Sequence, residues 1–128
     1  MNSTIPTSLN ILVVEDDPII RALVGRMLRG LGFSPNFARD GREAFEAVRG
    51  FSYDVIFMDL NMPFVDGITA TYAIREWERQ LDPRRKPTKI VATTSNVSRE
   101  DRDRCTAAGM DEFIGKPVSM ERLRAVLC

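Results

Sequence analysis

The sequence predicts an α/β domain built on a parallel β-sheet. Short apolar runs rich in β-branched residues alternate with longer stretches of helical period, which is the pattern of consecutive strand–helix units. Three runs, at residues 11–14, 55–58 and 90–92, are uniformly apolar, as strands buried on both faces of a sheet should be. The runs at residues 37–38 and 113–114 are shorter and weaker, so we expect them nearer the edges of the sheet.

Five amphipathic stretches follow the five runs. The first begins at Pro18, a residue that suits the first turn of a helix, and its apolar stripe ends at Gly30 and Gly32. Asp40 and Glu43 form a start similar to a capping box for the second. The third lies between residues 67 and 80. Serines are well placed to cap the last two helices, at Ser98 and Ser119.

The fourth expected helix has a narrow apolar face. Between residues 98 and 108 its only apolar groups are Cys105, Ala107 and Ala108, and most of the other positions are charged. A helix of this kind is weakly anchored and mostly solvated. It is either an ordinary surface helix or an element that moves.

Composition excludes several classes of function. A chain of 128 residues fits one domain, and its 18 basic and 18 acidic residues cancel, so no overall field draws it to nucleic acid or an anionic membrane. The apolar runs are too short to span a bilayer, and the two cysteines cannot form a disulfide framework. Because the chain has no histidine, Ser-His and Cys-His nucleophile pairs and imidazole zinc sites are excluded. We expect a soluble, cytoplasmic domain over residues 9–128, preceded by an unstructured leader at residues 1–8.

A basic connector precedes the fourth strand. Residues 82–87 carry Arg84, Arg85 and Lys86 between two prolines. Such a segment is either a phosphate-binding loop or a solvated loop, and we favour the solvated loop.

Acidic side chains follow two strands that we expect to be neighbours. Glu15, Asp16 and Asp17 follow the first strand, and Asp59 ends the third. Ligands of doubly wound sheets bind at the carboxyl ends of the strands, and like charges resist ionising together there unless a cation lies among them. Mg²⁺ prefers such oxygen ligands. Helix capping is the simpler explanation for Asp17, but it does not explain acids at both strand ends.

The same acids exclude redox cofactors that bind through phosphate. A flavin or dinucleotide phosphate needs free backbone N–H groups in the turn after the first strand. That turn is acidic here, and Pro18 has no N–H.

The residues at successive strand ends carry a family resemblance. They are the run 11–14 followed by Glu15-Asp16-Asp17, residues 54–63 with Asp66-Gly67, then Thr94, and finally Lys116-Pro117. In this order they closely resemble the receiver domains of two-component response regulators, over residues 9–128. The motifs are most similar to receivers of hybrid histidine kinases and to single-domain response regulators. The resemblance implies a flavodoxin-like (βα)5 fold with strand order 2-1-3-4-5.

The resemblance also implies the role of each site residue. Asp59 is the expected phosphoacceptor, and Lys116, before a cis proline bond, pairs with the phosphoryl oxygens. Thr94 senses the phosphoryl group and Phe113 changes rotamer with it. Spacing alone leaves open which of the three consecutive acids bind the metal. The family alignment selects these ligands for Mg²⁺ or Mn²⁺: Glu15, Asp16, Asp59 and the carbonyl of Asn61.

The implied function is phosphoryl transfer in a phosphorelay. Because the chain has no histidine, the donor is a histidine kinase, a histidine phosphotransfer protein or a small phosphodonor. Phosphorylation of Asp59 then changes the face formed by the fourth helix, fifth strand and fifth helix, which a downstream protein target or a fused output domain reads. We expect no direct binding to nucleic acid, because the chain has no basic recognition helix.

Two alternatives belong to other classes of function. A degenerate receiver acts only as a protein-binding module, but this chain keeps every residue that the chemistry requires. An aspartyl-nucleophile phosphatase of the haloacid dehalogenase type needs a second aspartate two positions after the nucleophile, where this chain has Asn61.

Overall fold

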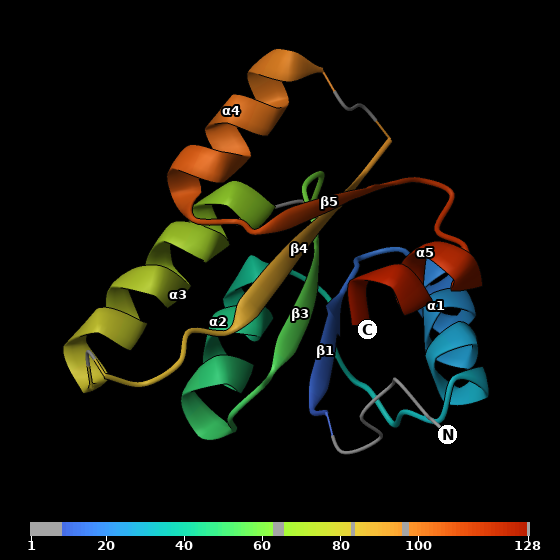
Figure 1. The fold of residues 1–128 in the computed structure, drawn as a ribbon, viewed down its shortest axis with the longest axis horizontal. Helices are drawn as coiled ribbons and strands as arrows, with labels where there is room; N and C mark the ends of the chain where they lie inside the picture. Colours follow the sequence, from blue (N-terminus) through green and yellow to red (C-terminus); the bar gives the residue numbers. More distant parts are fainter. Residues whose placement is uncertain (1–8, 63–65, 83, 96–97, 128) are drawn as a thin grey trace.

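The computed structural model describes residues 9–62, 66–82, 84–95 and 98–127. Five strand–helix units follow one another along the chain (Figure 1). The elements are β1 (Ile11–Val14), α1 (Pro18–Gly30), β2 (Asn36–Ala38), α2 (Gly41–Gly50), β3 (Val55–Asp59), α3 (Gly67–Leu81), β4 (Lys89–Thr94), α4 (Arg99–Ala108), β5 (Glu112–Gly115) and α5 (Met120–Leu127). The predicted leader at residues 1–8 lies outside the described residues.

The five strands form one parallel sheet. Their order is β2-β1-β3-β4-β5, so the two weak strands of the sequence lie at the edges and the acid-bearing strands β1 and β3 are neighbours. Register brings Val14 of β1 opposite Met58 of β3, one residue before Glu15 and Asp59 respectively. The predicted α/β class and strand order are therefore confirmed.

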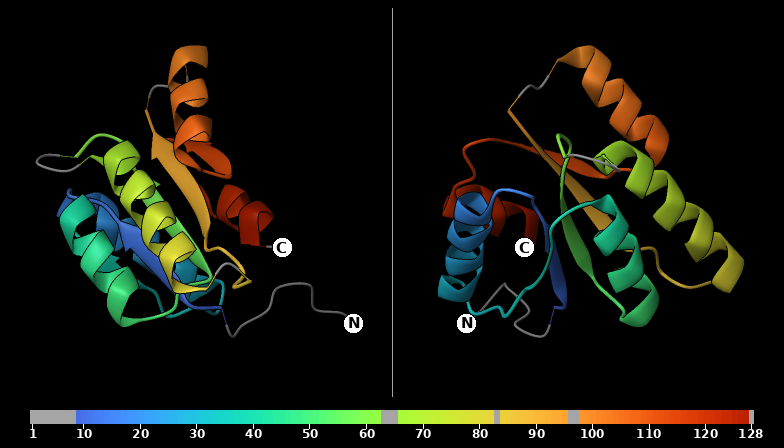
Figure 2. Two further views of the ribbon diagram at one scale, coloured as in Figure 1. Left: turned by 90° about the vertical axis from the view of Figure 1, so that its left-hand side faces the viewer. Right: turned by 180° about the vertical axis from the view of Figure 1, so that it is seen from behind.

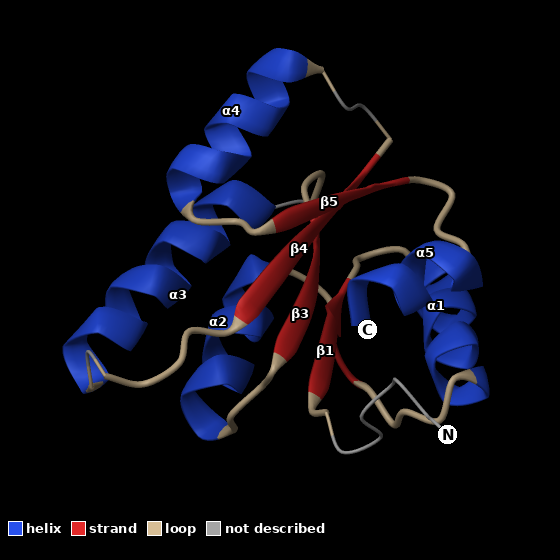
Figure 3. Ribbon diagram, in the orientation of Figure 1, coloured by secondary structure: helices blue, strands red, loops and turns tan. Residues whose placement is uncertain are grey.

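The helices cover both faces of the sheet (Figures 2 and 3). Alternate residues of β1 point to opposite faces, so Ile11 and Val13 pack with α1 and α5 while Leu12 and Val14 pack with α2, α3 and α4. Each fully buried aliphatic side chain of this kind stabilises the fold by roughly 1.5–3 kcal/mol. Two apolar layers, one on each face, thus hold the carboxyl ends of the central strands in place.

Capping side chains lie at the starts of the helices, where the sequence predicts them. The Asp17 carboxylate accepts hydrogen bonds from the N–H of Ile19 at 2.8 Å, and the hydroxyl of Ser119 accepts one from the N–H of Arg122 at 3.2 Å. Asp40 caps α2, but its partner Glu43 bonds the N–H of Arg39 at 2.8 Å. The capping box therefore closes one residue earlier than the usual motif.

The carboxyl end of α4 is held by polar contacts. Only Cys105 and Ala108 of this helix are buried, and Ala107 is exposed, so the apolar face is even narrower than predicted. The guanidinium of Arg75 on α3 donates two hydrogen bonds, of 3.0 and 2.8 Å, to the carbonyl of Gly109. Its Nη2 also lies 2.9 Å from Asp111. One half-buried cation therefore attaches the end of α4 to α3.

We expect Gly109→Ala to destabilise the protein by about 1–3 kcal/mol. Gly109 has φ of 108°, a conformation unfavourable for L side chains, and an added Cβ would lie 2.9 Å from Cγ of Arg75. Urea unfolding measures the change. Gly50→Ala is the matched control, because its Cβ would meet nothing within 4 Å and no destabilisation is expected. Equal losses of stability in the two variants would contradict this explanation.

Candidate functional site

Carboxylates converge at the edge where the central strands end. Glu15 follows β1, Asp59 is the last residue of β3, and Asp16 lies beside them. One carboxylate oxygen from each of these three residues lies within 4.8 Å of the others. Asp59 and Glu15 are buried, whereas Asp16 is exposed. The fold therefore brings together the acids that the sequence placed at separate strand ends.

One oxygen of Asp59 is satisfied and the other is not. Oδ1 accepts hydrogen bonds from the Lys116 amine at 3.0 Å and from the N–H of Asn61 at 3.1 Å. Oδ2 is buried and has no hydrogen-bond partner among the described residues. An unsatisfied buried acceptor is costly and rare, which makes this oxygen the natural position for a ligand.

Lys116 joins the two buried acids. Its Nζ lies 3.0 Å from Oδ1 of Asp59 and 3.1 Å from Oε1 of Glu15. Its backbone N–H donates to the carbonyl of Thr94 at 2.8 Å, which continues the β4–β5 pairing and carries the lysine to this edge. The Lys116–Pro117 bond is cis, as the resemblance implies.

Burial and charge act in opposite directions on the site. Burial alone would lower the pKa of Lys116, but hydrogen bonds and attraction from Asp59 and then Glu15 raise the pKa above its ordinary value. The pKa of Glu15 is raised to about 6, and burial is the largest cause. The charge of Asp59 also raises this pKa, whereas the hydrogen bond from the N–H of Asp17 and the contact with Lys116 lower it. Lys116 is therefore firmly protonated, whereas the ionised form of the Glu15 carboxyl is less favourable than it would be in water.

The donor set fits a hard divalent cation. Mg²⁺ takes carboxylate oxygens and completes its octahedron with water and phosphate oxygens. The site offers three carboxylates, one of them exposed to solvent, and an unsatisfied oxygen on Asp59. A second cation beside Lys116 would compensate the excess of negative charge.

The structure separates the three consecutive acids. The carboxylate of Asp17 caps α1, and its N–H donates to Oε2 of Glu15 at 3.1 Å. Asp17 is therefore occupied by the helix start, and the cluster of possible ligands contains Glu15 and Asp16 instead. This is the pair that the family alignment selects.

The two expected switch residues lie on β4 and β5, the strands that follow β3 in the sheet. Thr94 is buried at the end of β4, and Phe113 is half-buried on β5. The guanidinium of Arg102 on α4 lies over the ring of Phe113, with its carbon 5.5 Å from the ring centroid. Phe113 is thus held between the sheet and α4.

Two residues of the site were not predicted. The guanidinium of Arg21 donates to the carbonyl of Glu15 at 2.8 Å and supports the loop that carries the acids. At Gly67, an added Cβ would lie 2.3 Å from the backbone oxygen of Asp59, so only glycine permits this approach of α3. The sequence motif contains Gly67 but does not show this contact, and nothing in the spacing of Arg21 indicates its bond.

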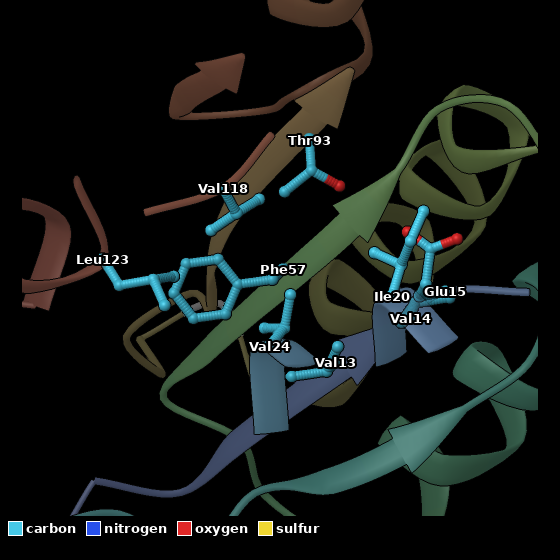
Figure 4. Close-up of a pocket in the computed structure, with 9 residues that line it drawn as sticks. All are labelled: Val13, Val14, Glu15, Ile20, Val24, Phe57, Thr93, Val118 and Leu123. Carbon is cyan, nitrogen blue, oxygen red and sulfur yellow. The ribbon is translucent and has the colours of Figure 1, made fainter. Parts of the chain in front are cut away.

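The site lies above a closely packed apolar layer (Figure 4). Phe57, Val24 and Leu123 meet there from β3, α1 and α5, and Glu15 is a further lining residue, drawn near Ile20 and Val14. The space left between them is about 10 Å³, at most the volume of one water. Any ligand must therefore bind at the acidic edge, outside this layer.

Known proteins resemble this chain in sequence. The family described as the response regulator receiver domain matches residues 11–128. Hybrid signal transduction histidine kinase L of Dictyostelium discoideum is 36% identical over 120 residues, which cover 91% of this chain and 7% of that protein. For histidine kinase 5 of Arabidopsis thaliana the corresponding values are 35% over 138 residues, 91% and 15%. The chain thus spans only a small part of these relatives.

Solved structures agree with the sequence matches. The receiver domain of sensor histidine kinase PA1611 from Pseudomonas aeruginosa PAO1, with a magnesium ion coordinated in its active site cleft, has a TM-score of 0.81 at 36% identity, covering 93% of both chains. The co-crystal structure of the Saccharomyces cerevisiae histidine phosphotransfer signaling protein Ypd1 with the receiver domain of Ssk1 has a TM-score of 0.89 at 32% identity. That match covers 98% of this chain and 89% of the other. Among the described residues, no helix has the length and apolar character needed to cross a membrane.

We expect Lys116→Met to destabilise the protein by about 3 kcal/mol at neutral pH without added metal. The substitution keeps the length of the side chain but leaves Glu15 and Asp59 buried without their cation, and breaking a buried pair from one side typically costs this much. Thermal and urea unfolding measure the change. As a control, Arg39→Gln removes the solvent-exposed ion pair with Glu43 and should cost less than about 1 kcal/mol. The explanation fails if the two substitutions cost the same.

Proposed function

This chain belongs to the response regulator receiver domain family, and we propose that Asp59 is its phosphoacceptor. The family acts in two-component and phosphorelay signalling, which gives the domain its function. The observation that carries the assignment of Asp59 is its Oδ2 atom, which is buried with no hydrogen-bond partner among the described residues, in a carboxylate that lies beside two further acids and Lys116. Because no hydrogen bond from the described residues occupies the lone pairs of this oxygen, they are available for attack on phosphorus.

The proposed reaction forms an acyl phosphate. Oδ2 of Asp59 attacks the phosphorus of a phosphohistidine, the N–P bond breaks, and the imidazole leaves with the electron pair of that bond. Lys116, which contacts the other oxygen of Asp59, neutralises charge on the phosphoryl oxygens. The residues that would hold Mg²⁺ or Mn²⁺ are Glu15, Asp16, Asp59 and the carbonyl of Asn61. When bound, the ion supplies positive charge to the incoming phosphoryl group.

The proposed donor is another protein. The chain has no histidine, so the phosphohistidine must come from a histidine kinase or a histidine phosphotransfer protein. The likeness to the receiver in the Ypd1 co-crystal structure and to receivers of hybrid kinases supports both donors. We place the protein in the cytoplasm and propose residues 9–128 as the receiver unit, with a downstream protein or fused domain as its target.

Thr94 and Phe113 are proposed to pass the signal on. A phosphoryl group on Asp59 adds roughly two negative charges at the buried site. The Thr94 hydroxyl, on the neighbouring strand, moves toward the new oxygens, and Phe113 takes the space that it leaves. The stack of Arg102 on Phe113 then has to rearrange, which changes the α4-β5-α5 face.

The two alternative functions are not favoured. Lys116 is ion-paired with Glu15 and Asp59, and a carboxylate oxygen of Asp16 lies within 4.8 Å of those two acids; a receiver used only for protein binding has no need of this arrangement. A haloacid dehalogenase-type phosphatase requires an acid at position 61, and the amide of Asn61 cannot donate the proton to a leaving group.

Asp59→Asn should abolish phosphorylation. The amide cannot attack phosphorus, so we expect no phosphoryl adduct by intact mass spectrometry after incubation with acetyl phosphate and Mg²⁺. Asp17→Asn is the control and should be phosphorylated normally, because asparagine also caps a helix. Phosphate uptake by the Asp59 variant would refute the assignment.

Asp16→Asn should weaken Mg²⁺ binding without unfolding the protein. Loss of an outer partner of a metal ligand costs on the order of 10–100-fold in affinity, and loss of a carboxylate ligand should cost at least as much. Asp16 is exposed, so the melting temperature should change little. Calorimetric titration with MgCl₂ measures the affinity, with Asp17→Asn again as the matched control. Similar affinities in the two variants would show that Asp16 is not a ligand.

A further inference from the structure

A second surface feature lies at the amino ends of the strands, opposite the carboxyl ends where Asp59 lies. Here the carboxyl ends of α2 and α3 are neighbours, to the left of the amino end of β3 in Figure 1. A groove of about 540 Å³ opens between them, which we call the Trp77 groove. The residues that line it are Asn10, Val48, Arg49, Gly50, Phe51, Ser52, Trp77, Leu81 and Arg85.

Large apolar side chains from two elements converge on the Trp77 groove. Phe51 follows the last residue of α2, and Trp77 and Leu81 are one turn apart at the end of α3. Phe51 and Leu81 are each 49% exposed, and Trp77 is half-buried. Single exposed apolar residues are ordinary on protein surfaces, but several around one concavity are typical of a binding site.

The groove is held in shape before any partner arrives. The ring of Phe51 packs edge-on against Tyr53, with centroids 5.1 Å apart. The hydroxyl of Tyr53 accepts a hydrogen bond from the side-chain amide of Asn36 at 2.8 Å. The backbone carbonyl of Tyr53 accepts another from the hydroxyl of Thr88 at 2.9 Å. The exposed ring therefore cannot easily turn inward, and binding would require little ordering of the groove.

The charges on the groove have one sign. Arg85, from the basic connector, donates a hydrogen bond to the Ser52 hydroxyl at 2.6 Å and so lies against the groove. Arg49 also lines the groove, with the carbon of its guanidinium 5.7 Å from the ring centroid of Phe45, and no carboxylate is among the described lining residues. The described residues of the connector are all exposed, as the favoured solvated loop predicts, although Arg85 is also bonded to Ser52. Two guanidinium groups beside apolar surface require a partner with negative charge.

We propose that the Trp77 groove binds an acidic segment of another protein, one that carries aliphatic or aromatic side chains between carboxylates. Aromatic residues and arginine dominate protein–protein contacts, and this groove offers Phe51, Trp77 and the two arginines around Leu81. Nucleic acid or an anionic membrane is the less suitable partner. The groove is concave, it has fewer cations than apolar groups, and the whole chain has no net positive charge.

This binding is independent of the phosphoacceptor. The Trp77 groove lies at the amino end of β3 and Asp59 at the carboxyl end. Asp59→Asn should therefore bind the same segment with unchanged affinity. Failure of either proposal leaves the other intact.

Trp77 is the only tryptophan of the chain, so its fluorescence reports directly on the groove. The probe is a short synthetic peptide in which glutamates flank a leucine and a phenylalanine. We expect it to change the Trp77 emission in a saturable and salt-sensitive way. A double variant, Arg49→Gln with Arg85→Gln, should bind about tenfold more weakly and lose most of the salt dependence. Arg104→Gln, an exposed arginine on α4, is the matched control and should bind like the parent protein.

Two further arms separate the possible partners. Leu81→Ser should weaken peptide binding while both arginines remain, because the apolar contact is lost. A peptide with lysine in place of glutamate should not bind. The proposal is overturned if the lysine peptide binds equally well, if the double variant binds like the control, or if single-stranded DNA or phosphatidylserine vesicles change the Trp77 emission and the acidic peptide does not.

Discussion

The contact of one lysine with two buried acids is the constraint on which the site depends. Lys116 comes from the end of β5, while Glu15 and Asp59 come from β1 and β3, so the pair of bonds connects three strands of the sheet. Removal of any one of these charges from water is costly, and the arrangement survives only because each has a partner. The compensation is incomplete, since three acids lie near one lysine and Oδ2 of Asp59 has no partner in the part of the chain that the structure describes. This deficit of positive charge favours the binding of a cation at this end of the strands.

The fold follows closely from patterns in the sequence. The central strands are uniformly apolar and the helix starts carry capping residues, so each local preference agrees with the final structure. Convergence of Glu15 and Asp59 was predictable because parallel strands end at one edge of a sheet. Side-chain contacts over long range were not predictable. The approach of Gly67 to the backbone of Asp59 and the bond from Arg21 to Glu15 depend on the exact placement of helices, which no periodicity encodes.

The basic connector shows the same limit at the other edge of the molecule. Its charge and prolines favour a solvated loop, and most of its side chains are indeed exposed. Arg85 is exposed too, but it also donates a hydrogen bond to the hydroxyl of Ser52, 33 positions away. Only the packing of α2 beside α3 brings these two residues together, and with them Phe51 and Trp77.

The attachment of α4 has a mechanical consequence. Arg75 ties the carboxyl end of the helix to α3, while few apolar contacts hold the remainder. A rod fixed at one end can only swing about that end, and its displacement grows with distance from the pivot. The largest excursion therefore falls on Arg99 and its neighbours in the first turn, whereas the last turn stays with α3. A small rotation about this pivot therefore displaces the charged groups of the first turn farther than those of the last turn.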